Sequence, residues 1–332
     1  MTRNDVAARA GVSTATVSRV YNSPGVVAPE KVERVLAAAD ELGYVPDKNA
    51  SALRRSGTGA VVLLERRGER IHGDRLYRWF YSDMMGGMRD VLDRSMYQFG
   101  IYAYGTAREI ERAPQGVLGD GVVLHGASDT RALAALKRRG HPYVCCGQVE
   151  MPRGVNAVYT DNVLGGRAAA AALLETGHAR PAHVTGAMSK VEVCRLRWDG
   201  FRAGMGDRDV TLVDGELGID GGYASAKKLV GAIKKERIDC IFVVNDLTAV
   251  GVTQALRDAG VRVPDDVSVV GYDNLPFVEV LPLRLSTIDI SFGAVYARAT
   301  EALLSSIRTG DPIRERIAPV YVPGETVRAR SQ

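Results

Sequence analysis

The hydrophobic pattern at the amino terminus predicts two short helices separated by a glycine turn. Apolar residues recur at helical spacing from Val6 to Ala10, and Gly11 follows where a helix needs a positive φ to end. Ser13 then stands at the N-cap position of a second helix, in which two valines point inward. Two short helices joined by a three-residue turn with glycine are typical of a helix-turn-helix, whose second helix enters the major groove of DNA.

The outward face of the second helix carries small or hydroxyl-bearing residues and one guanidinium. These residues are Thr14, Ala15, Thr16, Ser18 and Arg19. A guanidinium can bond O6 and N7 of one guanine together, so this face is suited to reading DNA. Taken alone, the pattern also fits a helical hairpin inside a core, and both interpretations stand at this point.

A third apolar stripe follows within the same compact unit. Pro29 and Glu30 open a predicted helix, Gly43 ends it, and Tyr44 begins the segment that closes the unit. The stripe is formed by Val32, Val35, Leu36, Ala39 and Leu42. Three helices of this size form a unit too small to be an enzyme.

From residue 60 onward, short apolar runs alternate with segments of helical periodicity. The predicted strands are 60–64, 101–104, 121–124, 143–146, 182–185, 240–244, 267–270 and, last, 317–322. The predicted helices are 84–97, 133–139, 168–175, 197–204, 223–235, 247–259 and 296–308. Two successive α/β series predict two doubly wound subdomains with parallel sheets, which bind ligands beyond the carboxyl ends of their strands.

Composition narrows the class of protein. The chain has 332 residues, of which 46% are hydrophobic and 25% charged, with a net charge of +4. This length favours two or three domains, and the small net charge means that basic residues must act locally on any DNA. Without a run of about eighteen apolar residues or an amino-terminal signal segment, we expect a cytoplasmic, nucleoid-associated protein and no membrane partner.

The chemistry-bearing residues point away from catalysis. Four cysteines show no zinc-ligand spacing, so we expect reduced thiols and no metal. A P-loop, a nucleophile elbow and a convincing dinucleotide fingerprint are all missing from the sequence. We therefore expect neither an enzyme nor a cofactor.

One motif pair carries a resemblance to a known family. D-V-A-x-x-A-G-V-S-x-A-T-V-S-R-V-x-N begins at Asp5, and E-R-V-L-A-A-A-x-E-L-G-Y-x-P ends at Pro46. Together they resemble the headpiece of the LacI/GalR family of bacterial transcription regulators. The resemblance implies a three-helix headpiece, a hinge and a periplasmic-binding-protein-like core. The expected boundaries are 1–46 for the headpiece, 47–59 for the hinge, 60–160 with 289–318 for the N-subdomain, and 161–288 with 319–332 for the C-subdomain.

The same resemblance assigns roles in DNA binding. It implies that Thr14, Ala15 and Arg19 read bases while Thr16, Ser18 and Asn22 hold phosphates. In the family, two hinge helices meet in the minor groove and a leucine from each opens a central base step. Leu53 occupies that position, and Ala50 is small enough for close helix contact. The implied state is a homodimer on a palindromic operator, although the composition of 47–59 also fits a plain linker.

For the small-molecule site, the resemblance implies three polar residues. In the family, the effector cleft is lined by the Arg of R-x-x-G-F, the Asn that follows the strand predicted here at 240–244, and the Asp of G-Y-D. Arg197, Asn245 and Asp273 match these positions. This set suits a polyhydroxylated, sugar-like ligand. Two alternatives stay open, namely that Arg197 pairs with Asp199 or Glu192 on the surface and that Asp273 caps a following helix.

Five further residues are expected at this cleft. They are Arg195, His125, Phe80, Tyr81 and Phe292. His125 follows a predicted strand, and the aromatic residues lie where the family places rings against a sugar, although each is equally compatible with a core position. We expect Asp246 to be structural.

The segment 65–78 departs from the family pattern, with five arginines and three acids. It is either a solvated loop or a feature that favours an anionic effector. Taken together, the sequence predicts a DNA-binding regulator, a repressor controlled by a small molecule. The alternative is a sugar-binding module without DNA regulation.

Overall fold

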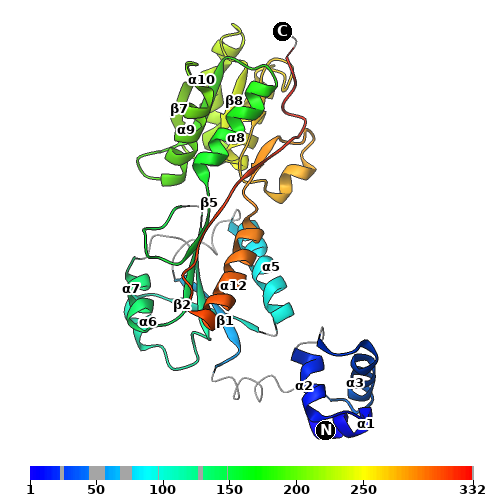
Figure 1. Cartoon of the computed structure of the whole chain (residues 1–332). Coiled ribbons are helices and arrows are strands. Elements are labelled where there is room, and N and C mark those ends of the chain that lie inside the picture. The colour runs from blue at the N-terminus through cyan, green and yellow to red at the C-terminus, as the bar shows by residue number, and fades with distance from the viewer. Residues whose placement is uncertain are drawn as a thin grey trace.

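The computed structural model describes residues 1–22, 26–44, 57–67, 77–95, 97–125, 130–147 and 149–330. Its amino-terminal part is a three-helix unit (Figure 1). The helices are α1 (Arg3–Ala10), α2 (Thr14–Asn22) and α3 (Pro29–Glu41). They enclose a core of their own, in which Val6, Val17 and Val35 are fully buried. Because this core is separate from those of the sheets, the headpiece has its own source of hydrophobic stability.

Local signals set the ends of these helices largely as the sequence predicts. Gly11 ends α1 with φ 63°, and the Oγ of Ser13 accepts a hydrogen bond of 3.1 Å from the backbone N–H of Thr16. One position of the α3 stripe was wrongly predicted. Leu36 is 47% exposed because α1 and α2 cover the face of α3 that carries Val35 and Ala39.

The first sheet has six parallel strands in the order β11-β5-β4-β3-β1-β2. Its strands are β1 (Ala60–Arg66), β2 (Gln98–Tyr104), β3 (Gly121–His125), β4 (Tyr143–Gly147), β5 (Ala157–Thr160) and β11 (Arg314–Ile317). Along β1, Val61 and Leu63 face one core while Val62 and Leu64 face another. Helices therefore cover both faces: α5 (Tyr77–Ser95) with α12 (Phe292–Thr309), and α6 (Ala107–Arg112) with α7 (Thr130–Arg138).

The second sheet has four parallel strands in the order β7-β6-β8-β9. They are β6 (Pro181–Gly186), β7 (Thr211–Gly215), β8 (Cys240–Val243) and β9 (Ser268–Val270). On one face lie α8 (Asn162–Glu175) and α9 (Glu192–Met205), and on the other α10 (Ile219–Ile233) and α11 (Asp246–Asp258). Two doubly wound sheets confirm the predicted fold class.

The chain passes between the two sheets at three places, namely after β5, after β10 (Thr287–Asp289) and after β11. β10 pairs with the antiparallel strand β12 (Val320–Val322). Figure 1 shows this pair between the two subdomains, with the red carboxyl-terminal segment running from one to the other. These three connections form the hinge region between the two subdomains, which is distinct from the predicted hinge segment 47–59.

Several predicted elements differ from the structure. The segment 317–322 is not one strand, because β11 and β12 belong to different sheets on either side of a crossing. Strands β5 and β7 and helix α6 were not predicted; β7 is an edge strand with exposed positions that break the apolar pattern. Helix α5 begins at Tyr77, so Phe80 and Tyr81 lie on it rather than before it. The described helices include none that is long and apolar enough to cross a membrane.

Candidate DNA-reading surface and effector site

The outward face of α2 carries the residues expected to read bases. Thr14, Ala15 and Arg19 are exposed, while the two valines of the same helix are buried. Arg19 stands in the last turn of the helix and the two small residues in its first turn. The three side chains are thus free of the headpiece core, as contact with base edges requires.

The expected phosphate-contacting residues are placed differently. The hydroxyl of Thr16 is 2.9 Å from the hydroxyl of Ser13, so it also takes part in capping α2. Ser18 is half-buried on the same helix. The side chain of Asn22, and Ala50 and Leu53 entirely, lie outside the described residues, so their roles stay predictions.

An arginine that the sequence analysis did not single out holds the helix-turn-helix together. A guanidinium nitrogen of Arg34 on α3 donates to the carbonyl oxygen of Ala10 at the end of α1. The same nitrogen would be 2.8 Å from a Cβ at Gly11. Arg34 thereby satisfies a free carbonyl of the α1 terminus, while the positive φ of 63° is the reason that glycine is favoured at position 11.

In the core domain, Arg197 is the centre of a buried polar network. Its side chain on α9 is 3% exposed and donates from Nε to the Oδ1 of Asn162 at 2.9 Å and from Nη1 to the carbonyl of Val244 at 2.5 Å. Its Nη2 donates to the Oδ1 of Asp273 at 3.1 Å, and its Cζ lies 3.7 Å from the centre of the Tyr272 ring. Arg197 therefore joins three segments of the second subdomain and makes no surface pair with Asp199 or Glu192.

Asp273 follows β9 in an unusual backbone conformation, with φ 112°. The residue is 8% exposed, and burial raises its pKa to about 6 although the Arg197 guanidinium acts in the opposite direction. The Asp273 carboxylate accepts from Arg197 and, among the described residues, does not cap a helix. A non-glycine residue is held in this region of φ and ψ only when its surroundings fix it, and such residues are frequent at ligand sites.

Asn245 and Asp246 both have structural bonds. Asn245 is the N-cap of α11, where its Oδ1 accepts from the backbone N–H of Thr248 at 2.8 Å. The buried carboxylate of Asp246 accepts from Thr287 at 2.5 Å and from the backbone N–H of Leu275 at 2.9 Å. Desolvation raises the pKa of Asp246, with the Asp273 charge adding to the effect. Asp246 thus ties the start of α11 to the hinge, as expected for a structural residue.

Three of the expected aromatic residues lie together at the start of α5 and α12. The rings of Phe80 and Phe292 meet edge to face at 5.0 Å, and the ring of His125 is 6.3 Å from that of Phe292. His125 also stacks on Tyr296, and its Nδ1 is in hydrogen-bond contact with the tyrosine hydroxyl. Burial lowers the pKa of His125 to about 4, so the imidazole is neutral at pH 7.

Tyr81 and Arg195 are directed elsewhere. Desolvation, together with a hydrogen bond from the Tyr81 hydroxyl to the buried carboxylate of Glu65, raises the pKa of Tyr81 to about 12. Arg195 is exposed on α9 and pairs with Asp199 at 2.9 Å along the same helix. The structure does not bring Arg195 together with Arg197 and Asp273.

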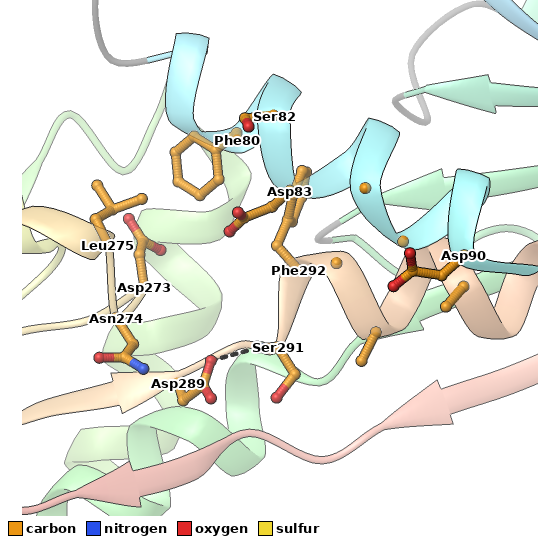
Figure 2. A pocket seen from close by; sticks show the side chains of 15 residues that line it. Phe80, Ser82, Asp83, Asp90, Asp273, Asn274, Leu275, Asp289, Ser291 and Phe292 are labelled. Carbon is orange, nitrogen blue, oxygen red and sulfur yellow. Dashed lines mark hydrogen bonds between the residues drawn. The ribbon is translucent and has the colours of Figure 1, made fainter.

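A pocket of about 520 Å³ lies where α5, α12 and the segment after β9 meet (Figure 2). The residues of this hinge pocket are Phe80, Ser82, Asp83, Gly86, Gly87, Asp90, Asp273, Asn274, Leu275, Asp289, Ser291, Phe292, Gly293, Ala294 and Ala297. It contains three residues expected from the sequence, namely Phe80, Asp273 and Phe292. The acids Asp83 and Asp289 were not expected, because nothing in their local pattern distinguishes them from surface carboxylates.

Comparisons with known proteins agree with this architecture. Residues 2–47 match the family described as bacterial regulatory proteins, lacI family, and residues 170–327 match the periplasmic binding protein-like domain. The HTH-type transcriptional regulator CelR of Thermobifida fusca is 36% identical over 292 residues, covering 82% of each chain.

Solved structures show the same fold. A transcriptional regulator CelR-cellobiose complex has a TM-score of 0.65 and 29% identity, covering 98% of this chain and 99% of that one. The lac repressor dimer bound to operator and the anti-inducer ONPF has a TM-score of 0.64 at 22% identity, covering 99% of each chain. The headpiece, the two doubly wound sheets and the CelR relationship lead to one conclusion. The chain belongs to the LacI family of bacterial regulatory proteins and is a DNA-binding transcriptional regulator.

Proposed function

We propose that this protein is a repressor that binds a palindromic operator as a homodimer, in the cytoplasm, under the control of a sugar-like effector. The observation that carries the DNA-binding part is the exposed row of Thr14, Ala15 and Arg19 on a helix whose other face is buried. A two-fold dimer presents two such helices, so each reads one half of a palindrome. The lac repressor, which has this fold, is a dimer in its operator complex.

Control by a small molecule requires a site that senses the arrangement of the two subdomains. Asp273 and Asn274 belong to the side of the second sheet, whereas Phe80 and Phe292 belong to helices that cover the first. A ligand between these groups binds one relative position of the subdomains better than another. The resulting change in DNA affinity is a coupling free energy that acts equally in both directions.

A sugar fits the chemistry of this region. The rings of Phe80 and Phe292 offer an apolar wall for the carbon face of a pyranose, and carboxylates and amides bind its hydroxyls. The related CelR complex contains cellobiose. We further propose the domain boundaries 1–46, 47–59, 60–160 with 289–318, and 161–288 with 319–332, in accord with the membership of strands in the two sheets.

The decisive experiment is selection of randomised duplex DNA by the purified full-length protein, repeated with Arg19→Ala and Leu53→Ala. We expect one palindrome to be enriched, with a relaxed preference at one position in the Arg19→Ala variant and weaker binding in the Leu53→Ala variant. The matched control is Arg9→Ala, which removes an exposed arginine of α1 that pairs with Glu41 at 2.7 Å. This control keeps the net charge of the Arg19→Ala variant but leaves the reading face intact.

The outcome separates the two candidate functions. A sequence-specific regulator is supported if the preference of the enriched palindrome relaxes in the Arg19→Ala variant and is unchanged in the Arg9→Ala variant. If no sequence is enriched while sugars still bind, the protein acts as a sugar-binding module instead. Recovery of the bound sugar unchanged distinguishes both from an enzyme.

A further inference from the structure

The hinge pocket has an unbalanced charge. Four of its lining residues are aspartates, namely Asp83, Asp90, Asp273 and Asp289, and its described lining contains no lysine, arginine or histidine. The guanidinium of Arg197, which contacts Asp273, is buried and already donates to Asn162, Val244 and Asp273. Arg197 therefore compensates one carboxylate and leaves three without a cationic partner in the described part of the pocket.

Two of these acids affect each other directly. Partial desolvation raises the pKa of Asp83, although its side chain is exposed, and the negative charge of Asp289 raises this pKa further. Asp83 comes from α5 and Asp289 from the end of β10, so the two carboxylates approach the pocket from different elements (Figure 2). The backbone N–H of Ser291 donates to one oxygen of Asp289 at 2.6 Å, which fixes its orientation. A cation between the two carboxylates relieves their repulsion.

A third carboxylate has an oxygen available for a ligand. Asp273 is more than nine-tenths buried, and its Oδ1 accepts from Arg197. Among the described residues, its Oδ2 has no hydrogen-bond donor, although the residue lines the pocket. Oδ2 is not among the buried polar atoms without a partner, so it is open to the pocket, where a ligand hydroxyl can donate a hydrogen bond to it.

The remaining walls exclude a bare metal ion as the occupant. The described residues contain no cluster of three His, Cys, Asp or Glu side chains placed to hold a metal. The edge-to-face pair of Phe80 and Phe292 presents apolar surface instead, and the volume of about 520 Å³ suits an organic molecule. Aromatic faces also attract the C–H groups next to an ammonium and the ammonium itself.

We propose that the effector is a carbohydrate carrying a free amino group, with its ammonium between Asp83 and Asp289 and a hydroxyl donating to Oδ2 of Asp273. This inference rests on the proposed effector function of the hinge region and names its ligand class. It replaces the anionic effector suggested by the arginine-rich segment, whose residues 68–76 lie outside the described residues. Arg67, one of the described arginines of that segment, pairs with Glu109, and neither of these two residues lines the pocket.

The test is isothermal titration calorimetry of the full-length protein with matched sugars at pH 7. Glucosamine is compared with glucose and with N-acetylglucosamine. The β-1,4-linked disaccharide of glucosamine is compared with cellobiose and with the di-N-acetylated form of the same amino disaccharide. Glucose 6-phosphate serves as the anionic sugar. Because a hydrogen bond to a charged group contributes more than a neutral one, we expect an amine to bind at least about tenfold more tightly than its hydroxyl and acetylated counterparts. The advantage should shrink at high salt.

Variants locate the ammonium. Asp83→Asn and Asp289→Asn should each lower the ratio of amine affinity to neutral-sugar affinity, because each removes one of the two charges that bind the ammonium. The control is Asp93→Asn, which removes an exposed carboxylate of the same helix outside the pocket. The proposal is supported if both pocket variants lose the tighter binding of the amine and the Asp93→Asn variant keeps it.

The proposal is overturned if none of the amines binds, if amine and hydroxyl sugars bind equally, or if glucose 6-phosphate binds most tightly. It is also overturned if the Asp93→Asn variant behaves like the pocket variants. Operator selection is done without any sugar, so its result is independent. An enriched operator with no amine binding rejects this inference alone, whereas amine binding without an operator rejects the proposed regulatory function alone.

Discussion

The Nη2 of Arg197 lies 3.1 Å from the Oδ1 of Asp273, and both side chains of this ion pair are buried. The pair joins α9 to the segment that leaves β9. Removing one partner of a buried pair leaves the other charge uncompensated, which costs about 3–5 kcal/mol. We therefore expect Arg197→Leu to lower the free energy of unfolding by about this amount, measured by urea denaturation with the fluorescence of Trp198 on the same helix.

Arg195→Ala is the matched control for this prediction. Arg195 also lies on α9 and also binds an aspartate, but its pair with Asp199 is exposed. Exposed pairs contribute about 0–1 kcal/mol, so this variant should unfold nearly like the unmodified protein. Equal destabilisation by the two substitutions would show that the burial of the Arg197 pair has no energetic consequence.

Substitution of two neighbouring glycines of α5, Gly86 and Gly87, should have opposite effects on stability. A methyl group at Gly87 would collide with the carbonyl oxygen of Gly293 at the start of α12, whereas one at Gly86 meets nothing within 4 Å. Gly87→Ala must push α5 and α12 apart, so we expect it to lower the melting temperature. Gly86→Ala should raise stability by about 0.5–1 kcal/mol, because alanine is the better helix former. Calorimetry of both variants tests the pair, and a Gly87→Ala variant as stable as Gly86→Ala would contradict the close helix contact.

The headpiece depends on the contact between Arg34 and the end of α1. Arg34→Ala leaves the carbonyl of Ala10 without this donor, so we expect a loss of about 1–2 kcal/mol and weaker operator binding. Amide hydrogen exchange within α1 and α2 measures the local loss. Arg9→Ala, which removes only an exposed pair with Glu41, should change exchange little. Protection that is unchanged in the Arg34→Ala variant would show that the turn is held by other contacts.

The sequence predicted those features that depend on local pattern. Gly11, Ser13 and the buried valines define the helix-turn-helix because caps and periodicity act over a few residues. Most strands were recognised for the same reason, since buried parallel strands are continuous apolar runs. Edge strand β7 was missed because its exposed positions interrupt such a run.

Features that depend on long-range contacts could not be predicted from the sequence. Asp83 and Asp289 are more than two hundred residues apart in the sequence numbering, and only the fold brings them to one pocket. The pairing of Arg197 with Asp273 was not predicted, because only the fold brings the two side chains together in a buried position. Family resemblance supplied the motif positions, while the bonds that orient Arg195 outward and Tyr81 toward Glu65 come from packing.

Stability should depend on pH through two buried histidines. Burial lowers the pKa of His125 to about 4 and that of His183 to about 3, from an ordinary value near 6.5. Between pH 4 and 6.5 the unfolded chain therefore binds protons that the folded chain does not. Acidification in this window favours unfolding, so the contribution of each histidine is complete above pH 6.5 and is lost as the pH falls.

Asp273 affects the pH dependence of stability in the opposite direction. Because the two effects partly cancel in the unmodified protein, single variants are needed to separate them. The raised Asp273 pKa of about 6 means that the folded chain takes up this proton first, so its contribution to stability falls as the pH rises from about 4 to 6. We expect His125→Gln to reduce the slope of unfolding free energy against pH by up to about 1.4 kcal/mol per pH unit between pH 4 and 6.5. Asp273→Asn should make the same slope steeper. Urea titrations at half-unit intervals measure both, and slopes that change in the same direction would contradict the assigned shifts.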